Sequence, residues 1–320
     1  MYLVCKEINV PSGEIMARKL LYNLNFIILF WIGTQFYHCS ITQTQHRALQ
    51  NFGDTALAMS TLSSNEMIAM RNATIQMNLN RIRIDSLSKP KSESPKDMSE
   101  LKDLDGSFDL TTVSLRLKAI ASIRYYAKLL LSLSSDSSQK ELDKATTNFL
   151  FSLENLSTEY KKMDEKKLNS IGEAIRLFGG IFTEYKKKDS IKEIILNSRE
   201  QIEILCDLLA KDFDPKSGKL ATSFILTGED LLLAAEETLD PAEGKPERTK
   251  AKALLAYNLA QKNIQKKDTI LPEIAKSILI LKQANAELYE TFRSEVYTEK
   301  DIIKFVNTVK SVQDYKNILK

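Results

Sequence analysis

The chain has 320 residues, of which 43% are hydrophobic and 27% are charged, and its formal net charge is +3. This composition excludes a wholly disordered chain, and the nearly neutral balance offers no concentrated basic face of the kind that nucleic-acid binding requires. With 10 glycines and 7 prolines the chain is poor in turn-forming residues, which argues against an all-β fold and predicts an all-α one.

An uncharged and strongly apolar run lies near the N-terminus. It extends from Leu20 to Tyr37 and follows two cations, Arg18 and Lys19. A positive flank before an apolar run is typical of a secretory signal or a membrane anchor. Residues 40–70 contain a single lysine or arginine, Arg47, so the charge asymmetry predicts a cytoplasmic N-terminus and a body on the other side of the membrane.

The most apolar part of this run is the segment FIILFWI, which we predict to contact the membrane. Its residues are Phe26, Ile27, Ile28, Leu29, Phe30, Trp31 and Ile32. A start at Met16 would place a short basic segment directly before the run, as in a signal peptide. We therefore expect residues 1–15 to be an untranslated or dispensable extension.

The apolar run leads into Cys39, which is followed by the polar stretch SITQTQ. Over about two dozen residues this arrangement resembles a bacterial lipoprotein signal sequence, in which the cysteine becomes the lipidated first residue. The resemblance implies lipidation at Cys39. Phe36, Tyr37 and His38 stand where that family has small residues, so an uncleaved anchor remains open as the alternative. We assign residues 1–39 to a signal peptide or membrane anchor.

Residues 40–87 are predicted to form one long helix or a helix pair. The apolar residues expected on its buried face are Phe52, Met59, Leu62, Ile68, Ile75 and Leu79. Gly53 and the polar cluster at residues 60–65 mark a possible break between two helices. The following residues, 88–108, are polar and contain Pro90 and Pro95, which predicts a linker.

Residues 109–320 are predicted to form an antiparallel multi-helix bundle. Two stripes of apolar residues recur at steps of three or four, as on core-facing helices. The first stripe is Leu142, Ala145, Phe149, Leu153, Leu156, Tyr160 and Met163, and the second is Leu168, Ile171, Ile175, Phe178, Phe182 and Tyr185. Breakers at 212–218 and 240–246, Thr269 with Pro272, and Thr298 with Asp301 predict the later helix boundaries. Short connections favour antiparallel neighbours.

Few residues with catalytic or ligand-binding potential occur in the predicted bundle. Both histidines, His38 and His46, lie at the leader boundary, so no histidine-based triad or metal motif is predicted in the body. The loops at 101–106 and 212–214 lack the complete carboxylate set of a calcium-binding loop. Cys206 is predicted to be a small buried hydrophobic residue. We predict no catalytic, metal-binding or cofactor-binding residue and no cofactor.

These patterns together predict a non-enzymatic, membrane-tethered helical protein of the bacterial cell envelope. Its body would lie on the periplasmic or extracellular side and present a surface to a protein partner, in a scaffold or adaptor role. The expected contacts are the membrane, through the N-terminal segment, and a protein, with no nucleic acid. Two alternatives stay open: a helical pore-forming or membrane-remodelling protein, and a ligand-binding or enzymatic bundle whose site cannot be read from residue spacing.

Overall fold

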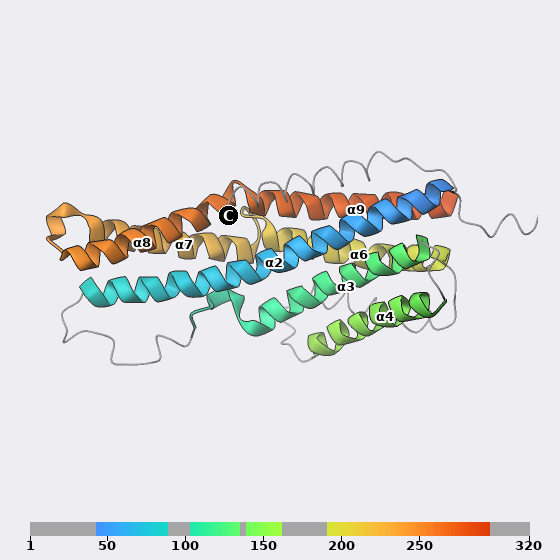
Figure 1. Ribbon diagram of the computed structural model, residues 1–320, viewed down its shortest axis with the longest axis horizontal. Helices are drawn as coiled ribbons and strands as arrows, with labels where there is room; N and C mark the ends of the chain where they lie inside the picture. The colour runs from blue at the N-terminus through green and yellow to red at the C-terminus, as the bar shows by residue number, and fades with distance from the viewer. Residues whose placement is uncertain (1–42, 89–102, 135–138, 162–190, 295–320) are drawn as a thin grey trace, which may run out of the picture. The chain divides into compact units, whose positions relative to one another are not determined.

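The structure, a computed structural model, describes residues 43–88, 103–134, 139–161 and 191–294 (Figure 1). Throughout these ranges the regular secondary structure is helical, with no strand, and the helices pack together, which confirms the all-α prediction. The α-helices are α2 (Gln43–Ser88), α3 (Leu110–Ser134), α4 (Gln139–Lys161), α6 (Ile191–Phe213), α7 (Lys219–Leu239), α8 (Glu247–Ile264) and α9 (Ile270–Ser294). Short 3-10 helices are η4 (Gly106–Phe108), η6 (Pro241–Glu243) and η7 (Gln265–Lys267).

Helix α2 is continuous over 46 residues. It runs through Gly53 and residues 60–65 without the break that these residues suggested. Its buried residues recur every three or four positions and include Leu49, Phe52, Ala56, Met59, Ser63, Glu66, Met70, Thr74 and Met77. The prediction of Ile68 on the buried face is wrong, because that side chain is 44% exposed. In this part of α2 the buried positions are occupied by Glu66, Thr74 and methionines. The predicted aliphatic position Ile68 therefore lies on a different face of the helix from the buried one.

Tyr126 of α3 is fully buried and joins several helices in the core. Its ring packs edge-on against Phe52 of α2 at 6.2 Å between centroids, and lies tilted against Phe149 of α4 at 5.7 Å. Its hydroxyl donates a hydrogen bond to Asn285 Oδ1 of α9 at 3.2 Å, and the Asn285 amide donates to the Arg199 carbonyl of α6 at 3.4 Å. One tyrosine therefore links helices that are far apart in the sequence.

Helices α6 and α9 pack side by side as an antiparallel pair (Figure 1). Arg199 lies 3.5 Å from Glu290, whereas Asp207, further along α6, lies 2.6 Å from Lys282, which comes earlier in α9. Helix α6 ends at Phe213 and α9 begins at Ile270. These boundaries confirm the helix stops and starts predicted from the breakers around residues 212–218 and 269–272.

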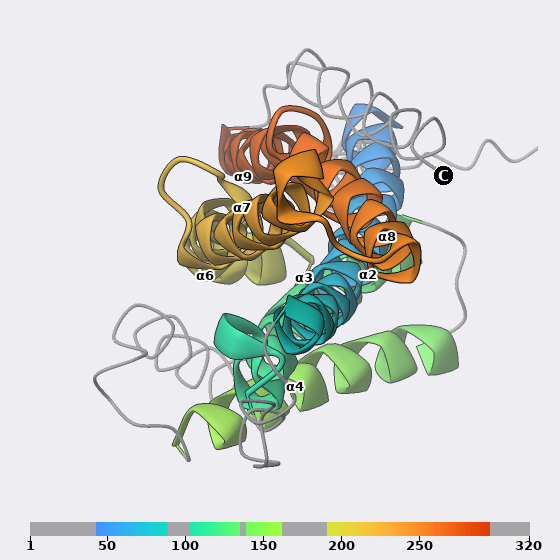
Figure 2. The same cartoon turned by 90° about the vertical axis from the view of Figure 1, so that its left-hand side faces the viewer.

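Helices α7 and α8 form a second pair, connected through residues 240–246 (Figure 2). Gly228 of α7 lets this pair approach its neighbours closely. A Cβ atom there would lie 2.9 Å from Ile264 Cγ1 of α8 and 3.6 Å from Met77 Sδ of α2. Helix α2 therefore contacts the α7–α8 pair with its C-terminal half, while Phe52, in its N-terminal half, contacts α3.

The chain enters α3 through a short ordered segment that packs against α2. Arg71 of α2 donates to the Phe108 carbonyl at 3.1 Å and to Asp105 at 2.9 Å, and Asn78 donates to the Leu104 carbonyl at 2.7 Å. Asp109 caps α3 by accepting a hydrogen bond from the Thr112 backbone N–H at 2.9 Å. Residues 103–108 are therefore held against α2, whereas residues 89–102 of the predicted linker lie outside the described residues.

Candidate functional site

The connection between α6 and α7 is a compact loop whose geometry requires glycine. Asp214 accepts hydrogen bonds from the Ser217 hydroxyl and from the Lys216 backbone N–H, and these bonds hold the pKa of its carboxyl below the usual value. Gly218 follows at the start of α7. A Cβ atom at this position would lie 1.9 Å from the Lys211 carbonyl oxygen, so any other residue would force the loop apart.

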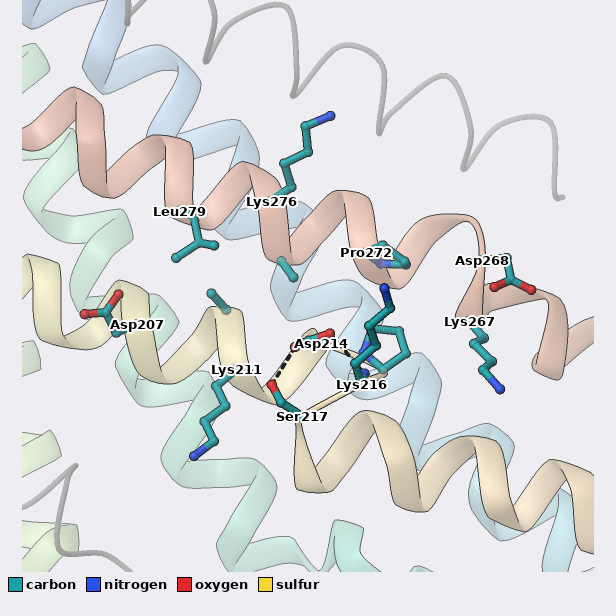
Figure 3. Close-up of a pocket in the computed structure, with 13 residues that line it drawn as sticks. Asp207, Lys211, Asp214, Lys216, Ser217, Lys267, Asp268, Pro272, Lys276 and Leu279 are labelled. Carbon is teal, nitrogen blue, oxygen red and sulfur yellow. Dashed lines mark hydrogen bonds between the residues drawn. The ribbon is translucent and has the colours of Figure 1, made fainter.

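A cavity of about 730 Å³ lies beside this loop, between the end of α6 and the start of α9 (Figure 3). Its less polar lining comes from Ala210, Pro215, Ser217, Pro272, Ala275 and Leu279. Its charged lining comes from Asp207, Lys211, Asp214, Lys216, Lys267, Asp268 and Lys276. We call this feature the joint cavity. It combines an apolar wall with a rim of both charge signs.

Several of the rim charges are already engaged within the protein. Asp207 pairs with Lys282 at 2.6 Å, Lys276 lies 3.5 Å from Glu273, and Lys267 lies 3.8 Å from Glu229. In Figure 3, Leu279 points toward α6, whereas the ammonium ends of Lys211 and Lys276 extend away from the gap between the helices. Among the described residues, the lining of the joint cavity includes no histidine or cysteine.

A buried ion pair lies where α2 meets η7. Lys266 Nζ donates to Glu66 Oε1 at 2.6 Å, and the two side chains are 16% and 3% exposed. The same ammonium lies 5.6 Å from the ring centroid of Phe224 of α7, which packs edge-on against Phe108 of η4. This pair therefore joins α2 to the connection between α8 and α9, and the ammonium also lies near α7.

A second partly buried pair connects α3 to the end of α6. Arg116 Nε donates to Asp212 Oδ2 at 2.9 Å. Burial raises the pKa of the Asp212 carboxyl, and the nearby Arg116 guanidinium opposes that rise. The sequence excluded a calcium-binding loop at residues 212–214, and the structure pairs Asp212 with arginine. Among the described residues, no group of three or more metal-binding side chains comes together.

Cys206 is fully buried in α6, as predicted. Burial raises the pKa of its thiol, which disfavours the reactive thiolate. The other predicted functional residues, Cys39 and the segment Phe26–Ile32, lie outside the described residues. Within the ranges that the structure describes, no helix combines the length and the hydropathy needed to cross a membrane.

The α7–α8 pair carries exposed leucines that the sequence reading did not single out. Leu226 and Leu233 of α7 are 52% and 58% exposed, and Leu254 and Leu255 of α8 are 52% and 71% exposed. We use the name α7–α8 surface for these four leucines together with the exposed charged residues of α7 and α8. The apolar runs that contain these leucines also supply core residues, so hydropathy alone did not separate the exposed leucines from the buried ones.

Comparisons with known protein families, curated sequences and solved structures found nothing that matches this chain. The function must therefore be argued from the residues themselves.

Proposed function

We propose that this protein is a non-enzymatic, membrane-tethered helical scaffold or adaptor of the bacterial cell envelope. Its N-terminal segment would hold it at the membrane, and its helical body would present a surface to a protein partner. The observation that carries the proposal is the uncharged run from Leu20 to Tyr37 behind Arg18 and Lys19. A run of this length and polarity suits a signal or an anchor.

The α7–α8 surface supports the display part of the proposal. Exposed large apolar side chains that gather on one part of a folded protein often mark a protein contact. Leu233 and Leu255 are each more than half exposed, although apolar positions elsewhere on the same helices, such as Leu231 and Ala256, are buried. This surface is therefore available in a body that already has a packed core.

The charge distribution supports the proposed orientation. Arg18 and Lys19 precede the apolar run, and Arg47 is the single lysine or arginine within residues 40–70. Positive charge on the N-terminal side favours a body on the periplasmic or extracellular side. Cys39 is the proposed lipidation point, and retention of the segment as an anchor is the alternative form of the same tether.

The test is the intact mass of the protein from the membrane fraction of a bacterial host that expresses the full chain. We expect a chain that begins at a diacylated or triacylated Cys39, and we expect Cys39→Ser to abolish this modification. Cys206→Ser is the matched control, because Cys206 is buried in α6 and should leave processing unchanged. An unmodified, full-length chain in the membrane would indicate an anchor. A full-length chain in the soluble cytosolic fraction would contradict the proposal.

A second candidate function, a ligand-binding bundle, is favoured by the joint cavity. Its volume of about 730 Å³ lies within the range of small-molecule sites, and its apolar wall faces a rim of charged groups. Native mass spectrometry of the purified protein tests this candidate. A bound small molecule that disappears when Ala275→Trp fills the cavity would support it, and the exposed substitution Leu255→Trp is the control.

A further inference from the structure

Helices α7 and α8 carry opposite charges. Helix α7 contains four acidic residues and one lysine, whereas α8 contains four basic residues and one glutamate. The acidic residues are Glu229, Asp230, Glu236 and Glu237, and the basic residues are Arg248, Lys250, Lys252 and Lys262. Each helix also exposes two leucines. The hairpin therefore exposes leucines on both helices, among acidic residues on α7 and basic residues on α8.

The exposed residues of α7 follow one line along the helix. Leu226 and Leu233 are about two turns apart, and exposed acids, among them Glu237, lie at the intervening and following turns. On α8, Arg248, Lys252 and Leu255 follow each other at steps of four and three and are all exposed. Residues at such steps share a helix face, so on each helix exposed leucine and charged side chains lie along one face.

Contacts within the chain use only some of these charges. Glu229 pairs with Lys267 at 3.8 Å, and Asp230 pairs with Arg81 at the same distance. Within the described part of the chain, Glu236 and Glu237 make no ion pair within 4.0 Å, and the same holds for Arg248 and Lys252. Two acids at the end of α7 and two cations at the start of α8 are thus left for another molecule.

We propose that a second copy of this chain binds at the α7–α8 surface, with α7 of one copy against α8 of the other. A second copy supplies what each helix lacks: leucines opposite leucines, and Glu236 and Glu237 opposite Arg248 and Lys252. Complementary charge of this kind selects the partner and its orientation. A basic or an acidic partner of another kind would satisfy only one of the two helices.

This inference rests on the proposed function only because it names a partner for the displayed surface. The membrane location enters neither its argument nor its test. Failure of self-association would leave the result at Cys39 untouched, and a cytosolic chain could still self-associate. The two outcomes are therefore distinguishable.

The test is a charge-reversal experiment on the full-length chain in detergent, with mass measured by sedimentation velocity over a concentration series. The α7 variant carries Glu236→Lys and Glu237→Lys, and the α8 variant carries Arg248→Glu and Lys252→Glu. Each variant alone places like charges opposite each other, so we expect self-association at least about tenfold weaker than that of the wild type. Mixed together, the two variants regain opposite charges at both contacts, so we expect the mixture to associate as the wild type does.

The matched control is Lys140→Glu with Lys144→Glu, which changes the net charge as the α8 variant does but alters two exposed lysines of α4, four residues apart like Arg248 and Lys252. We expect this control to associate as the wild type does. Circular dichroism verifies that each variant keeps its helices. If the α7 variant loses helical structure, the neutralising variant Glu236→Gln with Glu237→Gln takes its place. A monomeric wild type, association that ignores charge reversal, or a mixture that fails to recover would each overturn the proposal. If the copies associate through the N-terminal segment alone, charge reversal on α7 or α8 will not weaken the association.

Discussion

Glu66 and Lys266 show how one pair of residues can determine the stability of a helical core. The two carry opposite charges, are 200 residues apart in the sequence, and meet at 2.6 Å in a place where Glu66 is almost inaccessible to water. Removing both charges from water is costly, and their contact offsets much of that cost only while both are present. The pair is therefore sensitive to the loss of one partner.

We predict that Lys266→Met lowers the free energy of unfolding by about 3–5 kcal/mol, because a carboxylate stays buried without this ammonium. Adding Glu66→Gln to Lys266→Met should recover part of that loss, since the buried carboxylate is then replaced by a neutral amide. Urea unfolding followed by circular dichroism measures both. The control is Lys267→Met, which removes a half-exposed pair with Glu229 and should cost less than about 1 kcal/mol. Equal losses for the single and the double variant would contradict the prediction.

At the scale of the elements, close approach between helices depends on small residues in α2 and α7. Gly53 of α2 faces α3, and a Cβ atom there would lie 2.5 Å from Leu131 Cγ and 3.1 Å from the Ala127 carbonyl oxygen. Glycine weakens a helix interior, by about 1 kcal/mol relative to alanine. Here the missing side chain of Gly53 lets α2 approach α3 closely. Substitutions at Gly53 and Leu131 can therefore measure how much this close approach contributes to stability.

We predict that Gly53→Ala lowers the free energy of unfolding by about 1–3 kcal/mol, because overpacking against α3 outweighs the gain in helix propensity. In a Leu131→Ala background the nearest obstruction is absent, so the same change should cost less or become stabilising. A double-mutant cycle measured by urea unfolding gives the coupling between the two sites. Asn65→Ala, at an exposed position of α2, controls for propensity alone. Additive effects of Gly53→Ala and Leu131→Ala would show that Leu131 is not the obstruction.

At the scale of the whole molecule, α2 belongs to the core of the body. Phe52 packs against Tyr126, Arg71 holds the segment before α3, and Glu66 meets Lys266. These contacts all involve residues that follow residue 42. The proposed tether and the folded body should therefore be separable, with the division just before α2.

We predict that a chain that starts at Gln43 keeps its helices and unfolds cooperatively, at a Tm within about 4 °C of the full-length protein, because the contacts described above join α2 to α3, to the segment before α3 and to η7. A chain that starts at Asp103, which lacks α2, should lose cooperative unfolding. Thermal melts followed by circular dichroism compare the two with the full-length chain in the same detergent. Loss of cooperativity on removal of residues 1–42 alone would show that the leader is part of the core, as a buried first helix would be.

Local sequence patterns were sufficient to predict the all-α class and several helix boundaries, including the end of α6 at Phe213 and the start of α9 at Ile270. These features depend on interactions between near neighbours, which periodicity and breakers report directly. The sequence also supplies the proposed tether, which stays a prediction. Burial of Cys206 and Phe149 followed from the same local patterns.

Local patterns could not predict which face of α2 is buried beyond Ser63, which charges pair, or where a cavity forms, because these features depend on how the helices pack. Ile68 is exposed, whereas Glu66 is buried opposite Lys266, and nothing near either residue in the sequence records that contact. The joint cavity likewise needs α6 and α9 to lie side by side. Contacts between distant residues are set by how whole helices pack, and that packing reflects the summed burial of many side chains rather than any local pattern.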